Sequence, residues 1–135
     1  MRLGMIALLV VGLAGSTTRA EREPEPREKA DAVVLGNVKK ITTKESKFGN
    51  DGVRTDYTAE VEVTKAEKGE GIKVGDTIKV HWYDVTKRPS KLLPAAYGHE
   101  YKVKKGDAAK FWLMGSVKKG LTVIYNKDGV ETVKK

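Results

Sequence analysis

The chain has 135 residues, a net charge of +8 and no cysteine. This length suffices for one domain with a single core. The lack of cysteine excludes disulfides, thiolate zinc sites and cysteine-based catalysis, so stability has to come from burial and hydrogen bonding. Charged residues make up 33% of the chain with both signs interspersed, which is typical of a solvated surface.

The first twenty residues have the three-part pattern of an export signal. Arg2 is a basic start, Met5–Gly15 is an apolar run without charge, and Ala20 is the small residue that signal peptidases require. A membrane-spanning helix needs about 20 apolar residues, roughly twice this run. We therefore expect cleavage near Ala20, with a cut after Ser16 as the alternative. No cysteine follows the run, so we expect a secreted or periplasmic protein without a lipoprotein anchor.

Residues 21–29 form a charged segment that contains two prolines and no aliphatic or aromatic side chain. Such a composition predicts a disordered lead-in, because it offers nothing to bury. The composition changes at Ala30, where a run rich in alanine, valine and leucine begins. Residues 30–135 are therefore the predicted domain.

Alternation of apolar and polar residues predicts β-strands along this domain. The opening strand covers residues 31–43, and Gly36 stands where a bulge would let it bend. Further strands are predicted at residues 57–64, 77–83, 109–114 and 121–125, with a short last strand at 130–133. Their predicted inward residues are Tyr57, Ala59, Val61, Val63, Ile78, Val80, Trp82, Ala109, Phe111, Leu113, Leu121, Val123 and Tyr125.

The connections contain the glycine, asparagine and aspartate that turns require, with one exception. Residues 84–100 form a long connection containing Pro89 and Pro94, which is either a short helix over residues 90–96 or a long loop. Three strands, a long connection and two or three more strands predict an all-β fold. The predicted architecture is a small five- to six-stranded OB-like Greek-key barrel with a short helix or long loop between strands 3 and 4.

Three segments resemble the secreted OB-fold of netrin modules and tissue inhibitors of metalloproteinases. They are residues 32–38 (AVVLGNV), 57–69 (YTAEVEVTKAEKG) and 74–80 (VGDTIKV). The pattern also occurs in uncharacterised exported bacterial proteins, and the resemblance implies an OB barrel over residues 30–83. Those inhibitors chelate the protease zinc through an N-terminal cysteine, which this chain lacks. This chain therefore cannot inhibit a protease by that mechanism. A shared fold alone does not imply a shared function.

The sequence contains no recognisable catalytic or metal-binding motif. The two histidines, His81 and His99, have no HxxxH or HExxH spacing, and both are interpreted as surface residues. Glu60 and Glu62 share the outer face of one strand, where solvated charges are ordinary. No G-x-S-x-G nucleophile elbow is present. We expect a protein that is not an enzyme and uses neither metal nor cofactor.

Aromatic residues with basic neighbours on outward strand positions are the candidate ligand-binding residues. The set is Tyr83, Trp112, His81, Lys79, Lys110, Lys102 and Lys104, which Lys105, Lys118 and Lys119 could extend. OB barrels use such rings as stacking platforms and such lysines for phosphate. The alternative is that the long loop packs over Trp112 and makes it a second small core, because an exposed tryptophan is rare without a partner.

Four functional hypotheses follow, in this order. The first is an exported module without enzymatic activity, expected to be a monomer, that binds a protein or envelope partner, because this function needs no feature that is missing. The second is an oligosaccharide or polyanion binder, nucleic acid included, that uses the aromatic and lysine face. A protease inhibitor that acts by loop insertion is third, and an enzyme is fourth.

Overall fold

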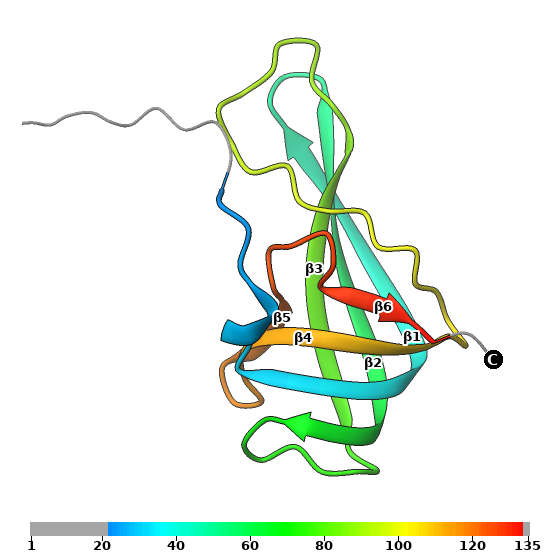
Figure 1. The fold of residues 1–135 in the computed structure, drawn as a ribbon. Coiled ribbons are helices and arrows are strands. Elements are labelled where there is room, and N and C mark those ends of the chain that lie inside the picture. Colours follow the sequence, from blue (N-terminus) through cyan, green and yellow to red (C-terminus); the bar gives the residue numbers. More distant parts are fainter. Residues whose placement is uncertain (1–21, 134–135) are drawn as a thin grey trace, which may run out of the picture.

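The computed structural model describes residues 22–133 as an all-β chain with a single 3-10 turn, Arg27–Lys29 (Figure 1). Its strands are β1 (Ala32–Phe48), β2 (Gly52–Lys68), β3 (Thr77–Lys87), β4 (Ala108–Ser116), β5 (Gly120–Val123) and β6 (Val130–Thr132). The predicted export signal, residues 1–20, lies outside the described residues. Between residues 22 and 133 there is no helix long and apolar enough to cross a bilayer.

Five of the strands close into a barrel. Their order is β1-β2-β3-β5-β4, and β4 pairs back onto β1 from Ala32–Leu113 to Asn37–Ala108. All of these pairings are antiparallel except that of β3 with β5, which is parallel and short. β6 extends the sheet along β4. This closed mixed barrel with one extra strand confirms the predicted OB-like fold class.

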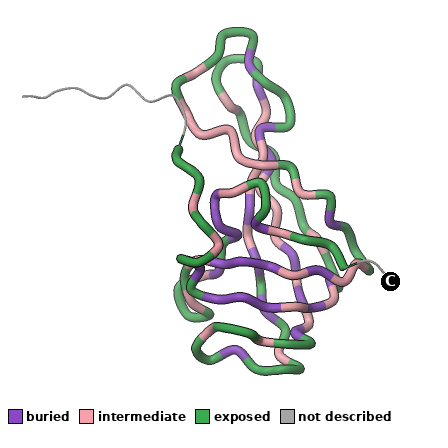
Figure 2. The backbone as a smooth tube through the Cα atoms, viewed as in Figure 1, coloured by how far each residue is buried: buried purple, intermediate pink, exposed green. Residues whose placement is uncertain are grey.

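The main core fills the interior of this barrel (Figure 2). On β2, the side chains of Ala59, Val61 and Val63 are buried, while the residues between them are partly exposed. On β4, Phe111 and Leu113 are fully buried. The alternation predicted from the sequence is therefore confirmed on β2 and β4. On β5 it holds only as far as Val123, where the strand ends, and Tyr125, which was predicted to face inward, is not part of the main core.

Gly36 lies at an irregularity in β1, where the register with β2 shifts between Leu35 and Gly36. A Cβ atom on Gly36 would stand 2.5 Å from the carbonyl oxygen of Glu62 and 2.5 Å from Cγ1 of Val61. Only a glycine lets β2 cross β1 this closely, which confirms the bend predicted at this position.

Beyond the barrel, β1, β2 and β3 continue as a three-stranded ribbon that projects upward in Figure 1. β1 pairs with β4 only as far as Asn37, yet it pairs with β2 as far as Phe48. β1 and β2 are accordingly longer than predicted. No side of the ribbon faces the barrel interior. The alternation of apolar and polar residues, from which the strands were predicted, therefore ends before the strands end.

The long connection between β3 and β4 contains no helix, so the loop alternative is correct. Pro94 has no N–H group for a helical hydrogen bond. The hydroxyl of Tyr97 forms two hydrogen bonds with the main chain of Leu93. It accepts from the Leu93 N–H (2.8 Å) and donates to the Leu93 carbonyl (3.0 Å). The loop then pairs with the edge of β3, where the N–H of Val85 donates to the carbonyl of Tyr97 (2.9 Å).

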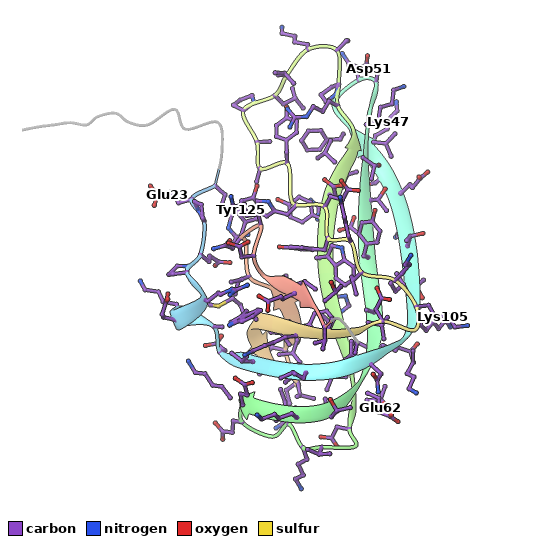
Figure 3. The ribbon with its side chains drawn as sticks, turned by 45° about the vertical axis from the view of Figure 1, so that its right-hand side comes forward. Glu23, Lys47, Asp51, Glu62, Lys105 and Tyr125 are labelled. Carbon is purple, nitrogen blue, oxygen red and sulfur yellow. The ribbon has the colours of Figure 1, made fainter. Side chains whose placement is uncertain are left out.

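The predicted disordered lead-in differs from the structure over residues 22–29, which lie against the barrel. The N–H of Glu25 donates to the carbonyl of Tyr125 (2.8 Å), and Arg27 forms an ion pair with Glu131 (3.1 Å). Figure 3 places Tyr125 beside the segment that carries Glu23. Main-chain hydrogen bonds and ion pairs hold this segment. Neither kind of contact can be predicted from amino-acid composition.

We predict that Gly36→Ala lowers the free energy of unfolding by about 1–3 kcal/mol, because the added methyl group meets backbone that has to move. Urea denaturation followed by circular dichroism measures this change. Gly71→Ala is the control: its Cβ would meet nothing within 4 Å, and only its positive φ of 78° opposes the substitution. Equal losses in the two variants would contradict the close crossing of β1 and β2.

Candidate functional site

A groove follows the outer face of β3, where the side chains of Lys79, His81 and Tyr83 succeed one another. Its first part has a volume of about 430 Å³ and lies between β3 and the turn from β4 to β5. A second part of about 180 Å³ continues to Arg54 and Tyr83, and His81 lines both parts. We call the two parts together the β3 groove. It exists because β5 pairs with β3 only at Val80 and His81.

The lining of the β3 groove carries an excess of positive charge. Its basic side chains are Lys79, Lys118, Lys119 and Arg54. Its one carboxylate is that of Asp56, which already accepts from the guanidinium of Arg54 (Nη2 to Oδ1, 2.8 Å). The groove therefore offers three lysine ammonium groups to an anion, while the carboxylate in its lining is paired with Arg54.

Two polar contacts fix the rings at the centre of the groove. The hydroxyl of Thr58 lies 3.0 Å from Nδ1 of His81, which orients the imidazole. The guanidinium of Arg54 lies 3.9 Å from the centre of the Tyr83 ring. Burial raises the pKa of Tyr83, and its hydroxyl donates to the carbonyl of Ala96 (3.4 Å).

Trp112 lies outside the β3 groove and is 8% exposed. It packs in a second apolar cluster with Ala30, Val33 and Ile124, and the guanidinium of Arg27 stands 3.7 Å from its ring centre. Of the two interpretations of Trp112, the second small core is the one that the structure shows. Its cover is the N-terminal segment, whereas the sequence suggested the long loop.

The remaining predicted site residues do not join the groove. Lys110 forms an ion pair with Glu67 (3.0 Å) and lies 5.0 Å from the ring centre of Trp112. Lys102 and Lys104 are exposed on the connection between β3 and β4. Of the seven residues proposed as one face, only Lys79, His81 and Tyr83 line the groove.

Sequence reasoning missed Arg54 and Thr58, which β2 brings to the groove. Both occupy outward positions in the same phase of alternation as Glu60 and Glu62. The signal was present for Thr58, which lies in the strand predicted from Tyr57, but Arg54 fell outside every predicted strand. Lys118 and Lys119, named only as an extension of the predicted face, line the groove itself.

An aromatic cluster adjoins the end of the groove at Tyr83. It surrounds a small cavity of about 30 Å³, and its rings are Trp82, Tyr83, His99, Tyr101 and Tyr125. The ring of His99 lies 4.5 Å from that of Tyr125, so His99 packs among aromatic rings and is not the surface residue predicted. Burial raises the pKa of Tyr101, whose hydroxyl donates to the carbonyl of Asn126 (2.6 Å).

Among residues 22–133 no group of three or more histidine, cysteine, aspartate or glutamate side chains is placed to hold a metal ion. The chain matches no known protein family. No curated protein matches it either. The functional argument therefore depends on the β3 groove and on the surfaces that surround it.

We predict that the tryptophan fluorescence of the protein is poorly quenched by acrylamide, because Trp82 and Trp112 are only 6% and 8% exposed. Arg27→Ala should increase the quenched fraction, since it uncovers one face of Trp112. Arg54→Ala is the matched control, because it removes a guanidinium from a tyrosine ring. Strong quenching of the wild-type protein would contradict the covered position of Trp112.

We also predict a pH-dependent effect of Asp84→Asn. Burial, followed by the nearby charge of Glu100, raises the pKa of Asp84 above 3.8 in the folded protein. A raised pKa contributes stability that is fully present below the unfolded pKa and is lost as the pH rises through the folded value. Asp84→Asn should therefore gain stability relative to the wild type between about pH 4 and neutrality, by on the order of a few tenths of a kcal/mol. Urea melts at several pH values measure this difference, and a difference that shrinks with rising pH would contradict it.

Proposed function

We propose that the protein is a binding module without enzymatic activity, which takes an anionic ligand in the β3 groove. The observation that carries this proposal is the convergence of Lys79, Lys118 and Lys119 on one groove whose single carboxylate is already paired with Arg54. Lysine ammonium groups attract carboxylate, sulfate and phosphate groups from any direction, which suits a flexible ligand.

The size of the groove supports an extended ligand. Its first part alone has the volume of an ordinary small-molecule site, and the second part lengthens it past His81 to Tyr83. The hydroxyl of Thr58 and the imidazole of His81 add hydrogen-bonding groups between the two ends. An acidic oligosaccharide, with one charge on each repeating unit, fits this arrangement.

The distribution of exposed apolar residues favours this proposal over a mainly apolar protein interface. The large apolar residues that are well exposed within residues 22–133 are Val74, Leu92, Val117 and Val133, which lie in four different segments. Four such residues, one of which (Val117) lines the β3 groove itself, are too few for the broad apolar patch that marks a protein interface. The charge in the groove is the more specific feature.

The proposal also agrees with the export signal expected from the sequence. An exported protein meets acidic polysaccharides of the cell envelope more often than it meets nucleic acid. The closed barrel supplies a rigid wall for the groove, because β3 is held by β2 on one side and by β5 and the long loop on the other. A groove on such a wall is preorganised, which reduces the free energy lost when the ligand orders it.

We predict that a sulfated oligosaccharide binds the protein and that affinity falls steeply as salt increases, because the contacts are ionic. Lys79→Ala combined with Lys118→Ala and Lys119→Ala should weaken binding at least tenfold and flatten the salt dependence. Titration calorimetry or fluorescence anisotropy measures both effects.

The matched control combines Lys102→Ala, Lys104→Ala and Lys105→Ala, which likewise removes three charges, all of them exposed and outside the groove. If this control weakens binding as much as the groove variant does, net charge and not the groove binds the ligand. Binding that does not respond to salt would count against the proposal altogether.

A further inference from the structure

The surface beneath the N-terminal segment is built like a peptide-binding site. We call it the peptide track; it runs along the outer side of the barrel where Figure 3 places Tyr125. Its residues are Trp112, Tyr125, Asn126, Asp128 and Glu131. Residues 22–27 of the same chain lie on it, so the structure shows how an extended peptide is held there.

The centre of the peptide track pairs with a peptide main chain. The N–H of Glu25 donates to the carbonyl of Tyr125 (2.8 Å), and the side-chain amide of Asn126 donates to the carbonyl of Glu25 (2.9 Å). The N–H of Tyr125 donates to Oε1 of Glu25 (2.6 Å). A peptide strand added to a sheet edge gains affinity through such main-chain bonds, and here a glutamate carboxylate replaces one carbonyl.

The second part of the track is a complete guanidinium site. The guanidinium of Arg27 stands 3.7 Å from the ring centre of Trp112. Its Nε donates to the carbonyl of Asp128 (2.9 Å), and its Nη2 donates to Oε2 of Glu131 (3.1 Å). An aromatic face, a carbonyl and a carboxylate together recognise arginine and do not suit lysine equally, because only a planar guanidinium stacks and donates in one plane.

A third contact extends the track toward the aromatic cluster. The guanidinium of Arg22 lies 4.9 Å from the ring centre of Tyr125, and its Nη2 donates to Oε2 of Glu25 (3.0 Å). Half of the Arg22 side chain is exposed. This end of the segment is therefore the more weakly held one.

Departure of the bound segment uncovers one face of Trp112 but leaves the core inside the barrel closed. Residues 22–29 contribute none of the side chains that form the two apolar clusters, and the first of those clusters' residues in the chain is Ala30. The segment is held by hydrogen bonds, an ion pair and ring stacking on the side that faces the barrel. Such contacts exchange readily with an equivalent peptide, because both partners are well solvated when apart.

We propose that the peptide track binds an extended protein segment that carries a glutamate two residues before an arginine, and that residues 22–27 occupy it as an internal ligand. The partner is thus a polypeptide of defined chemistry, and it competes with the chain's own segment for the track. This inference is independent of the β3 groove.

The test supplies the segment in trans. The host is the full chain with Glu25→Ala and Arg27→Ala, which loosens the internal segment, and the probe is a fluorescent peptide with the sequence of residues 22–29. Fluorescence anisotropy should show saturable binding to this host, at least tenfold tighter than to the wild-type chain, whose track is filled. A peptide with Arg27→Ala should bind at least tenfold more weakly than the wild-type peptide.

A scrambled peptide of the same composition controls for non-specific charge. The proposal is overturned if the host, with wild-type circular dichroism and a cooperative melt, does not bind the peptide. It is equally overturned if the wild-type, Arg27→Ala and scrambled peptides bind alike. Should the double variant fail to fold, the chain with Arg27→Ala alone is the host, and the same outcomes decide.

Discussion

The pairing of β4 with β1 is the constraint on which the rest of the structure depends. The chain has no cysteine, so this ladder and the side chains behind it, and no disulfide, join the first and last strands of the barrel. Phe111 and Leu113 are fully buried on the inner face of β4, so closing the sheet and burying the core are one event. The same closure turns the alternate residues of β4 and β3 outward. Lys79, His81 and Tyr83 on β3 and Trp112 on β4 are among these outward residues.

The fold could be predicted wherever a strand faces the barrel interior. Ala59, Val61 and Val63 alternate with polar residues because one side of β2 is buried there. Toward the hairpin the same strand runs along the ribbon, and Gly52–Asp56 carry no such alternation. Backbone hydrogen bonds to β1 and β3 hold this part of β2. Such bonds do not depend on side-chain type, so they cannot be predicted from the pattern of apolar residues.

The candidate site was predictable only in part, for a related reason. Alternation places Lys79, His81 and Tyr83 on the outer face of β3, and the structure puts them in one groove. The same alternation places Trp112 on the outer face of β4. It carries no information about which other segment covers a residue on that face. The cover is Arg27, which approaches from a segment 85 residues away in the sequence. The composition of that segment predicts disorder because it contains no large apolar side chain to bury. The segment is nevertheless held in place, by a guanidinium stacked on a ring and by a few hydrogen bonds.

The β3 groove and the peptide track meet at the aromatic cluster. Tyr83 lines the groove, Tyr125 belongs to the track, and their ring centres are 6.4 Å apart. Arg22 lines the small cavity between them, so a segment seated on the track adds a positive charge at the end of the groove. The Arg22 guanidinium is itself paired with Oε2 of Glu25 (3.0 Å), so displacement of the segment removes this ion pair from the end of the groove. Thermodynamic linkage makes any effect of the segment on an anion in the groove reciprocal: the anion changes the affinity of the track for the segment by the same factor.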